Sequence, residues 1–145
     1  MKTLHFSIQI KAPAEKVWKT LWDDATYSRW TAAFCEGSYV VTDWNEGSRI
    51  LFLSPGGEGM FSTIDKKIPN KFMAFKHLGV VKEGKEQPAD EESEKWTGAM
   101  ETYTLEEKNG VTDVIVSVAT TDGFEQHFND MFPKALENLK TLSEN

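Results

Sequence analysis

The hydrophobic pattern of this 145-residue chain switches between two periods, and these switches constrain its fold more than any other feature. From about residue 37 to residue 120, apolar and polar residues alternate with a period of two, which is typical of half-buried strands. The Asn109-Gly110 pair is the strongest hairpin signal in this stretch, because both residues accept a positive φ. The stretch therefore predicts an antiparallel meander of six strands, at 38–44, 48–54, 59–67, 71–79, 96–106 and 112–120.

A strand and two short helices are predicted ahead of the meander. Residues 3–11 alternate between apolar and polar side chains, which predicts a first strand. Pro13 suits the start of a helix because its φ is fixed and its missing N–H is not needed there. The apolar stripe that follows predicts a helix over Ala14–Trp22, and a second short helix should end near Trp30.

A long helix is predicted after the meander, over about residues 123–142. Pro133 interrupts this pattern, since a proline inside a helix removes one hydrogen bond and clashes one turn back. We expect a kink there, or an irregular first turn before a regular helix from about Phe132. The stripe that supports the helix consists of Phe124, Phe128, Met131, Ala135, Leu139 and Leu142.

The charge balance argues against nucleic acid as a partner, and the hydropathy pattern argues against membrane insertion. The chain has 16 Lys and Arg against 23 Asp and Glu, a net charge of −7 at pH 7. Binding to nucleic acid depends on clustered cations, so nucleic acid is not expected as a partner. No apolar run approaches the roughly 20 residues that membrane insertion needs.

The lack of an apolar signal core and the single Cys35 favour a cytoplasmic protein, and the length favours a single domain over residues 1–145.

An acidic segment breaks the alternation between residues 83 and 95. It contains six acidic residues and two lysines, which is −4 of the net charge, and it has no large apolar side chain. Blocks of like charge are usually solvated. We therefore expect a mobile loop here that contributes little to stability.

The order of elements and several short motifs resemble those of the START-like superfamily, also called the helix-grip or SRPBCC fold. The resemblance is to the branch homologous to the C-terminal domain of the activator of the ninety-kilodalton heat-shock chaperone's ATPase. It covers essentially the whole chain. The segments that carry it are IKAPAEKVW at 10–18, YSRW at 27–30, EGSRI at 46–50, YTLEEKNGVT at 103–112 and the helix at 124–142.

This resemblance implies an α+β helix-grip fold. A seven-stranded antiparallel sheet would wrap around the long C-terminal helix, with two short helices between the first two strands. Many relatives keep an apolar cavity between sheet and helix. Members of the superfamily bind lipids, hormones or polyketides, act as cyclases or hydrolases, or bind protein partners, and the fold alone does not choose among these functions.

A candidate ligand site follows from the resemblance. In a sheet that wraps the helix, alternate strand residues point toward it, and a ligand pocket combines apolar walls with a few convergent polar groups. The same large rings could instead fill the space as packed core. If the space is open, we expect it to be lined by Phe52, Phe75, His77, Tyr103, Phe124, His127, Phe128 and Met131.

The first hypothesis for function is the binding of a small apolar or amphipathic molecule. No catalytic constellation, metal site or cofactor site is evident, because the three histidines lie far apart in sequence and have no ligand-like neighbours. One alternative is a cyclase- or hydrolase-like enzyme on the same cavity, using His77, Glu101, Tyr103 or His127. Proton transfer there would need Glu101 to meet a histidine. A second alternative is a chaperone-activator-like module that binds a protein partner.

Overall fold

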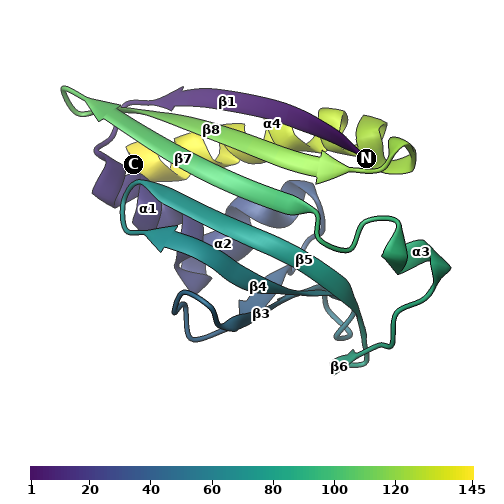
Figure 1. The fold of residues 1–145 in the computed structure, drawn as a ribbon. Coiled ribbons are helices and arrows are strands. Elements are labelled where there is room, and N and C mark those ends of the chain that lie inside the picture. The colour runs from purple at the N-terminus through teal and green to yellow at the C-terminus, as the bar shows by residue number, and fades with distance from the viewer.

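The computed structural model describes residues 1–145 as one antiparallel sheet with its longer helices on one face (Figure 1). Its strands are β1 (Lys2–Ile10), β2 (Tyr39–Val41), β3 (Arg49–Leu53), β4 (Gly59–Ile68), β5 (Phe72–Lys82), β6 (Lys85–Glu86), β7 (Met100–Lys108) and β8 (Val111–Thr120). Its helices are α1 (Ala14–Trp22), α2 (Asp24–Trp30), the 3₁₀ turn η1 (Thr31–Ala33), α3 (Glu91–Glu94) and α4 (Asp122–Glu144). The structure confirms the predicted α+β helix-grip fold.

Every strand pair in the sheet is antiparallel, in the order β1-β8-β7-β5-β4-β3-β2, with β6 paired to β5. The two edges are therefore β1 and β2. Helices α1, α2 and α4 lie behind the sheet in Figure 1, and α4 runs along β1 and β8. Helix α4 therefore faces the strands across the space in which the family resemblance predicts a ligand site.

The local signals at α1 and at the β7–β8 turn predicted the structure correctly. Helix α1 begins directly after Pro13 and ends at Trp22, as predicted. The backbone N–H of Ala14 donates to the Glu107 carboxylate (2.7 Å), which ties the helix start to β7. Asn109 and Gly110 adopt positive φ values of 54° and 79° and join β7 to β8 in a tight hairpin.

Helix α4 is buried unevenly along its length. It is helical from Asp122 onward, so the alternative of an irregular first turn before Phe132 is wrong. Its C-terminal half is packed into the core by Ala135, Leu136 and Leu139, each at most 2% exposed. Its N-terminal half is barely covered, and Phe124 is 53% exposed. Neither α4 nor any other helix combines the length and apolarity needed to cross a membrane.

The acidic segment is more structured than the sequence suggested. It contributes an eighth strand, β6, beside the seven predicted, and the single turn α3. Most of its residues are exposed, as a solvated loop requires, and its mobility stays a prediction. The α3 turn is stabilised by a reciprocal capping box, in which Asp90 accepts from the backbone of Ser93 and Ser93 accepts from the backbone of Asp90. Ser93 is only 3% exposed. Capping side chains supply the stability that apolar area does not.

Two strand boundaries differ from the prediction because of local backbone geometry. The strand predicted at 38–44 ends at Val41, and Trp44 adopts a φ of 64°, which a strand cannot accommodate. The strand predicted at 96–106 begins only at Met100, because Gly98 turns the chain with a φ of 89°.

Candidate functional site

A cavity of about 450 Å³ lies between the sheet and the N-terminal half of α4. The α2–η1 segment closes one side, and the turn between β3 and β4 closes another. Most of the lining side chains are apolar, and many are aromatic. The lining residues are Trp22, Tyr27, Trp30, Thr31, Phe34, Cys35, Ser38, Phe52, Leu53, Ser54, Glu58, Gly59, Met60, Phe75, Glu101, Tyr103, Phe124, His127, Phe128 and Phe132.

The cavity has a buried floor and an exposed mouth. Trp30, Phe75 and Tyr103 on the floor are each at most 2% exposed. The mouth is formed by solvent-exposed residues of α4, of the β3–β4 turn and of the segment after η1. These mouth residues are Cys35, Glu58, Gly59, Phe124 and His127. A molecule entering here would pass polar and apolar rim groups before reaching the aromatic floor.

Helices α1 and α2 deliver three of the floor rings. The Trp30 indole N–H donates to the Leu21 carbonyl (3.0 Å), and the Tyr27 ring packs edge-on against Trp30 with centroids 5.6 Å apart. The Trp22 ring meets the Tyr103 ring nearly perpendicularly, with centroids 5.1 Å apart. Perpendicular contacts are a favoured arrangement for aromatic pairs, so these rings are held at the wall.

A chain of four hydrogen-bonded side chains crosses β4, β5 and β7 and reaches the cavity at Glu101 and Tyr103. Ser62 Oγ lies 2.7 Å from His77 Nδ1, and His77 Nε2 lies 3.0 Å from Glu101 Oε1. The Tyr103 hydroxyl donates to Glu101 Oε2 (2.5 Å). The strand register places Ser62 directly opposite His77, and it places Glu101 opposite Phe75 on the adjacent pair. The meeting of Glu101 with a histidine, left open by the sequence, therefore occurs.

The environment sets the charge of the groups of this chain that reach the cavity. Burial raises the pKa of the Glu101 carboxyl, but the hydrogen bond and electrostatic attraction of His77, and then the hydrogen bond from Tyr103, outweigh burial and leave that pKa below its usual range. Burial and then the Glu101 charge raise the pKa of Tyr103 well above its usual range, and the same two causes raise that of Tyr27. At neutral pH the wall therefore presents one carboxylate and two neutral phenols.

The arrangement limits which chemistry is possible. Ser62 is fully buried and does not line the cavity, so its hydroxyl cannot attack a molecule bound there. His77 has both ring nitrogens engaged and also stands behind the wall. Glu101 and Tyr103 reach the cavity itself. No group of three His, Cys, Asp or Glu side chains is placed to hold a metal ion.

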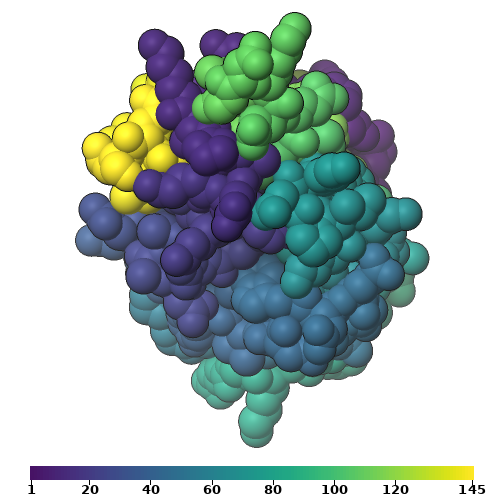
Figure 2. All heavy atoms as spheres, turned by 90° about the vertical axis from the view of Figure 1, so that its left-hand side faces the viewer, coloured from purple at the N-terminus to yellow at the C-terminus, as the bar shows by residue number.

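A second depression, of about 660 Å³, lies at the opposite end of the molecule (Figure 2). There the start of α1, the β4–β5 turn and β7 meet, in purple, teal and green. Its lining is mostly polar and charged, namely Ala14, Glu15, Asn70, Lys71, Phe72, Thr104, Leu105, Glu106 and Glu107. It lacks the aromatic enclosure of the first cavity.

Comparison with known protein families establishes the relationship of the chain. Residues 11–144 match the family described as "Activator of Hsp90 ATPase homolog 1-like protein". The chain belongs to this family. The resemblance to the START-like superfamily is thereby confirmed. A comparison with curated protein sequences finds no match.

Solved structures share the fold of this activator-homologue chain along its whole length. The solution structure of the Aha1 dimer from Colwellia psychrerythraea is 28% identical, with a TM-score of 0.75, covering 99% of this chain and 97% of that one. Protein MLL2253 from Mesorhizobium loti is 17% identical, with a TM-score of 0.73 and coverage of 97% and 96%. CalU16 from Micromonospora echinospora is 18% identical, with a TM-score of 0.67 and coverage of 97% and 75%.

Within this family member, six of the eight residues predicted for the site line the cavity. They are Phe52, Phe75, Tyr103, Phe124, His127 and Phe128. His77 lies behind the wall, in contact with Glu101. Met131 is half-buried on α4 and does not line the cavity.

Sequence reasoning missed the wall formed by α1, α2 and η1. Trp22, Tyr27, Trp30 and Phe34 all line the cavity from this side. The spacing of Tyr27 and Trp30 placed them on one buried face, but it did not show which surface that face covers. Only the tertiary packing shows that it faces the C-terminal helix and the strands.

Proposed function

We propose that this chain binds a small molecule with a largely apolar, ring-containing body in the cavity between the sheet and α4. The observation that carries the proposal is a space of about 450 Å³, open at its mouth, whose floor is aromatic and whose wall bears one fixed carboxylate. Ligand sites commonly have volumes of about 300–1,000 Å³, apolar walls and a few placed polar groups.

The packing around the cavity supports this proposal. Phe52 and Phe128 are only half-buried although both face the molecular interior, and Phe124 is exposed at the mouth. Burying a phenylalanine side chain contributes about 1.5–3 kcal/mol. These rings therefore present apolar area that a ligand would cover.

The proposal can be tested with a neutral, environment-sensitive dye such as Nile red. We expect saturable binding with one site per chain. Ser38→Trp should weaken it at least several-fold, because Ser38 is a small, half-buried wall residue where an indole would occupy the cavity. Ser7→Trp, on the exposed side of β1, is the matched control and should bind as the wild type does.

Two outcomes would refute the binding proposal. One is the absence of saturable dye binding to the wild-type protein. The other is unchanged binding in the Ser38→Trp variant, which would place the dye elsewhere. Native mass spectrometry of the protein purified from its own source would then show whether any small molecule accompanies it.

An enzyme of the cyclase or hydrolase type on the same cavity is the second candidate. The contact between His77 and Glu101 favours it, because acid–base chemistry needs a positioned carboxylate or histidine within reach of the substrate. Here Glu101 would be the base at the wall and Tyr103 a hydrogen-bond donor. A Glu101→Gln variant that still binds the molecule but no longer converts it would support this candidate over simple binding.

A further inference from the structure

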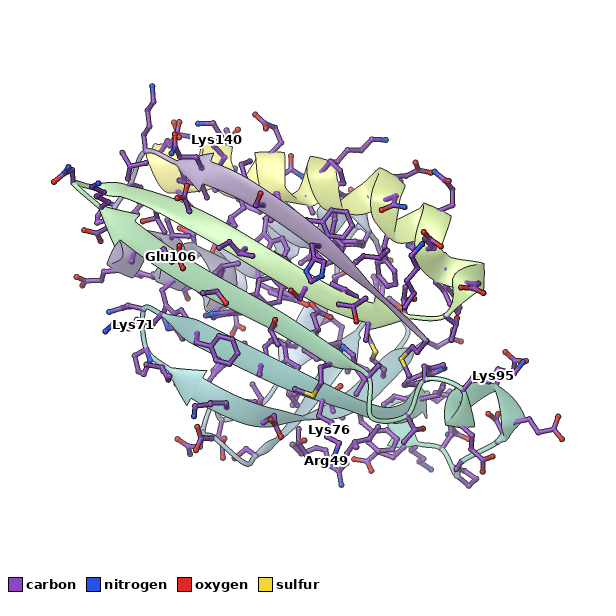
Figure 3. The ribbon with its side chains drawn as sticks, turned by 45° about the horizontal axis from the view of Figure 1, so that its top comes forward. Arg49, Lys71, Lys76, Lys95, Glu106 and Lys140 are labelled. Carbon is purple, nitrogen blue, oxygen red and sulfur yellow. The ribbon has the colours of Figure 1, made fainter.

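The charges that reach the cavity are of one sign. Two carboxylates line it, Glu101 at the wall and Glu58 at the mouth, and neither a lysine nor an arginine does so. Figure 3 places the labelled cations around the outside of the molecule. These cations are Arg49, Lys71, Lys76, Lys95 and Lys140, and none of them lines the cavity. A carboxylate or phosphate on a ligand would therefore meet like charge and no counterion.

The carboxylate at the wall keeps its charge because of the hydrogen bonds behind it. An ionised Glu101 can only accept, so His77 Nε2 must carry the proton of their 3.0 Å contact. The other ring nitrogen of His77, Nδ1, lies 2.7 Å from the hydroxyl of Ser62. Ser62 and His77 stand behind the wall, so only the Glu101 carboxylate and the neutral Tyr103 hydroxyl of this chain reach the cavity.

Aromatic rings gather beside that charge. The Tyr103 hydroxyl contacts Glu101, and the Trp22 and Trp30 ring centroids lie 5.1 and 6.3 Å from that of Tyr103. Electron-rich ring faces attract cations, most strongly where water is excluded. A fixed negative charge at the edge of an aromatic floor is a combination that stabilises a buried positive charge.

We propose that the ligand of this cavity is a cation, an amine or quaternary ammonium group carried on an aromatic or alicyclic body. The positive group pairs with Glu101, and the body lies against the aromatic floor. Fatty acids and other anionic amphiphiles are selected against. This inference rests on the proposed binding function and narrows it to one class of ligand.

The test uses three naphthalene probes of nearly equal size that differ in head group: naphthylmethylamine, naphthylmethanol and naphthoate. Each is titrated at neutral pH against the wild-type protein loaded with neutral Nile red. The amine should displace the dye about tenfold or more better than naphthoate, with the alcohol between them. Equal displacement by the amine and naphthoate, or stronger displacement by naphthoate, would overturn the proposal.

Two isosteric variants test whether the preference for the amine depends on Glu101. Glu101→Gln removes the wall charge and should reduce the preference for the amine over the alcohol to within about twofold. Glu106→Gln makes the same change on the same strand at an exposed position outside the cavity, and should leave that preference unchanged. A preference lost equally in both variants would show a general effect of protein charge and would refute the assignment to Glu101.

Failure of this inference is distinguishable from failure of the binding proposal. If Nile red does not bind saturably, the cavity does not bind small molecules and both proposals fall. If the dye binds but the three probes compete equally, only the cation preference falls. The wild-type series decides between these results even if Glu101→Gln fails to fold.

Discussion

The two halves of α4 should respond differently to truncation, and the comparison tests whether the cavity is open. Phe128 lies in the N-terminal half, where its ring is half-buried, faces the cavity and packs on Phe132 with centroids 5.8 Å apart. Leu139 lies in the C-terminal half and is fully buried. Phe128→Ala and Leu139→Ala therefore remove a larger and a smaller side chain from one helix, in two different environments.

The expected costs reverse the order of side-chain size. Truncating a fully buried phenylalanine costs about 3–5 kcal/mol, and truncating a fully buried leucine about 2–5 kcal/mol. Because one side of Phe128 already faces open space, we expect its truncation to lower the free energy of unfolding by only about 1–2 kcal/mol. Leu139→Ala should fall in the full range for a buried leucine. For a chain of this length, each kcal/mol corresponds to a Tm difference of about 2–4 °C.

Urea denaturation followed by tryptophan fluorescence and by far-UV circular dichroism gives both free energies. Coincident transitions from the two probes would justify a two-state analysis. Nile red titration of the folded variants completes the comparison, since Phe128→Ala should weaken dye binding and Leu139→Ala should leave it unchanged. A loss of 3 kcal/mol or more for Phe128→Ala, roughly the cost of a fully buried ring, would show that Phe128 is packed core and that no open cavity exists.

Three further predictions concern the rest of the chain. Glu101→Gln should lower stability by about 1–3 kcal/mol at pH 7. Because the folded pKa of Glu101 lies below its ordinary 4.5, this difference should be complete above pH 4.5 and vanish as the pH falls through the folded value in acid-titrated urea melts. Gly59→Ala should unfold the β3–β4 hairpin or fail to express as folded protein, since a Cβ would lie 1.8 Å from the Phe52 carbonyl oxygen, whereas Gly123→Ala, in open space, should fold normally by circular dichroism. In residues 83–95, hydrogen exchange should protect the amide of Ser93 more than its exposed neighbours; uniformly fast exchange would mean that the α3 turn does not persist in solution.

The features that sequence predicted well are those decided within a few residues. The start of α1 follows from Pro13 and the apolar stripe after it, and the β7–β8 hairpin follows from the backbone freedom of Asn109 and Gly110. The end of β2 escaped prediction because Trp44 suits a strand by residue type yet adopts a positive φ. The α3 turn escaped because its stability depends on hydrogen bonds rather than on an apolar period.

Only the part of the candidate site that is formed by the strands and α4 was predictable from the sequence. Alternation along β3, β5 and β7 indicated which strand residues face α4, and most of those predicted for the site line the cavity. The contact between His77 and Glu101 could not be predicted from the sequence, because it depends on how β5 and β7 align across more than 15 intervening residues. Register over such a distance is fixed by the whole sheet and not by a local signal.

The separation between floor and mouth has a consequence for how members of this fold can diversify. The exposed mouth residues Cys35, Glu58, Phe124 and His127 are absent from the buried core cluster that holds sheet and helices together. Exposed substitutions outside such a core usually change stability by about 0.5 kcal/mol or less. The rim can therefore drift in sequence, or be randomised in a library, while the scaffold remains folded. Floor residues such as Trp30, Phe75 and Tyr103 belong to that core cluster, so substitutions at the floor should cost more stability than substitutions at the mouth.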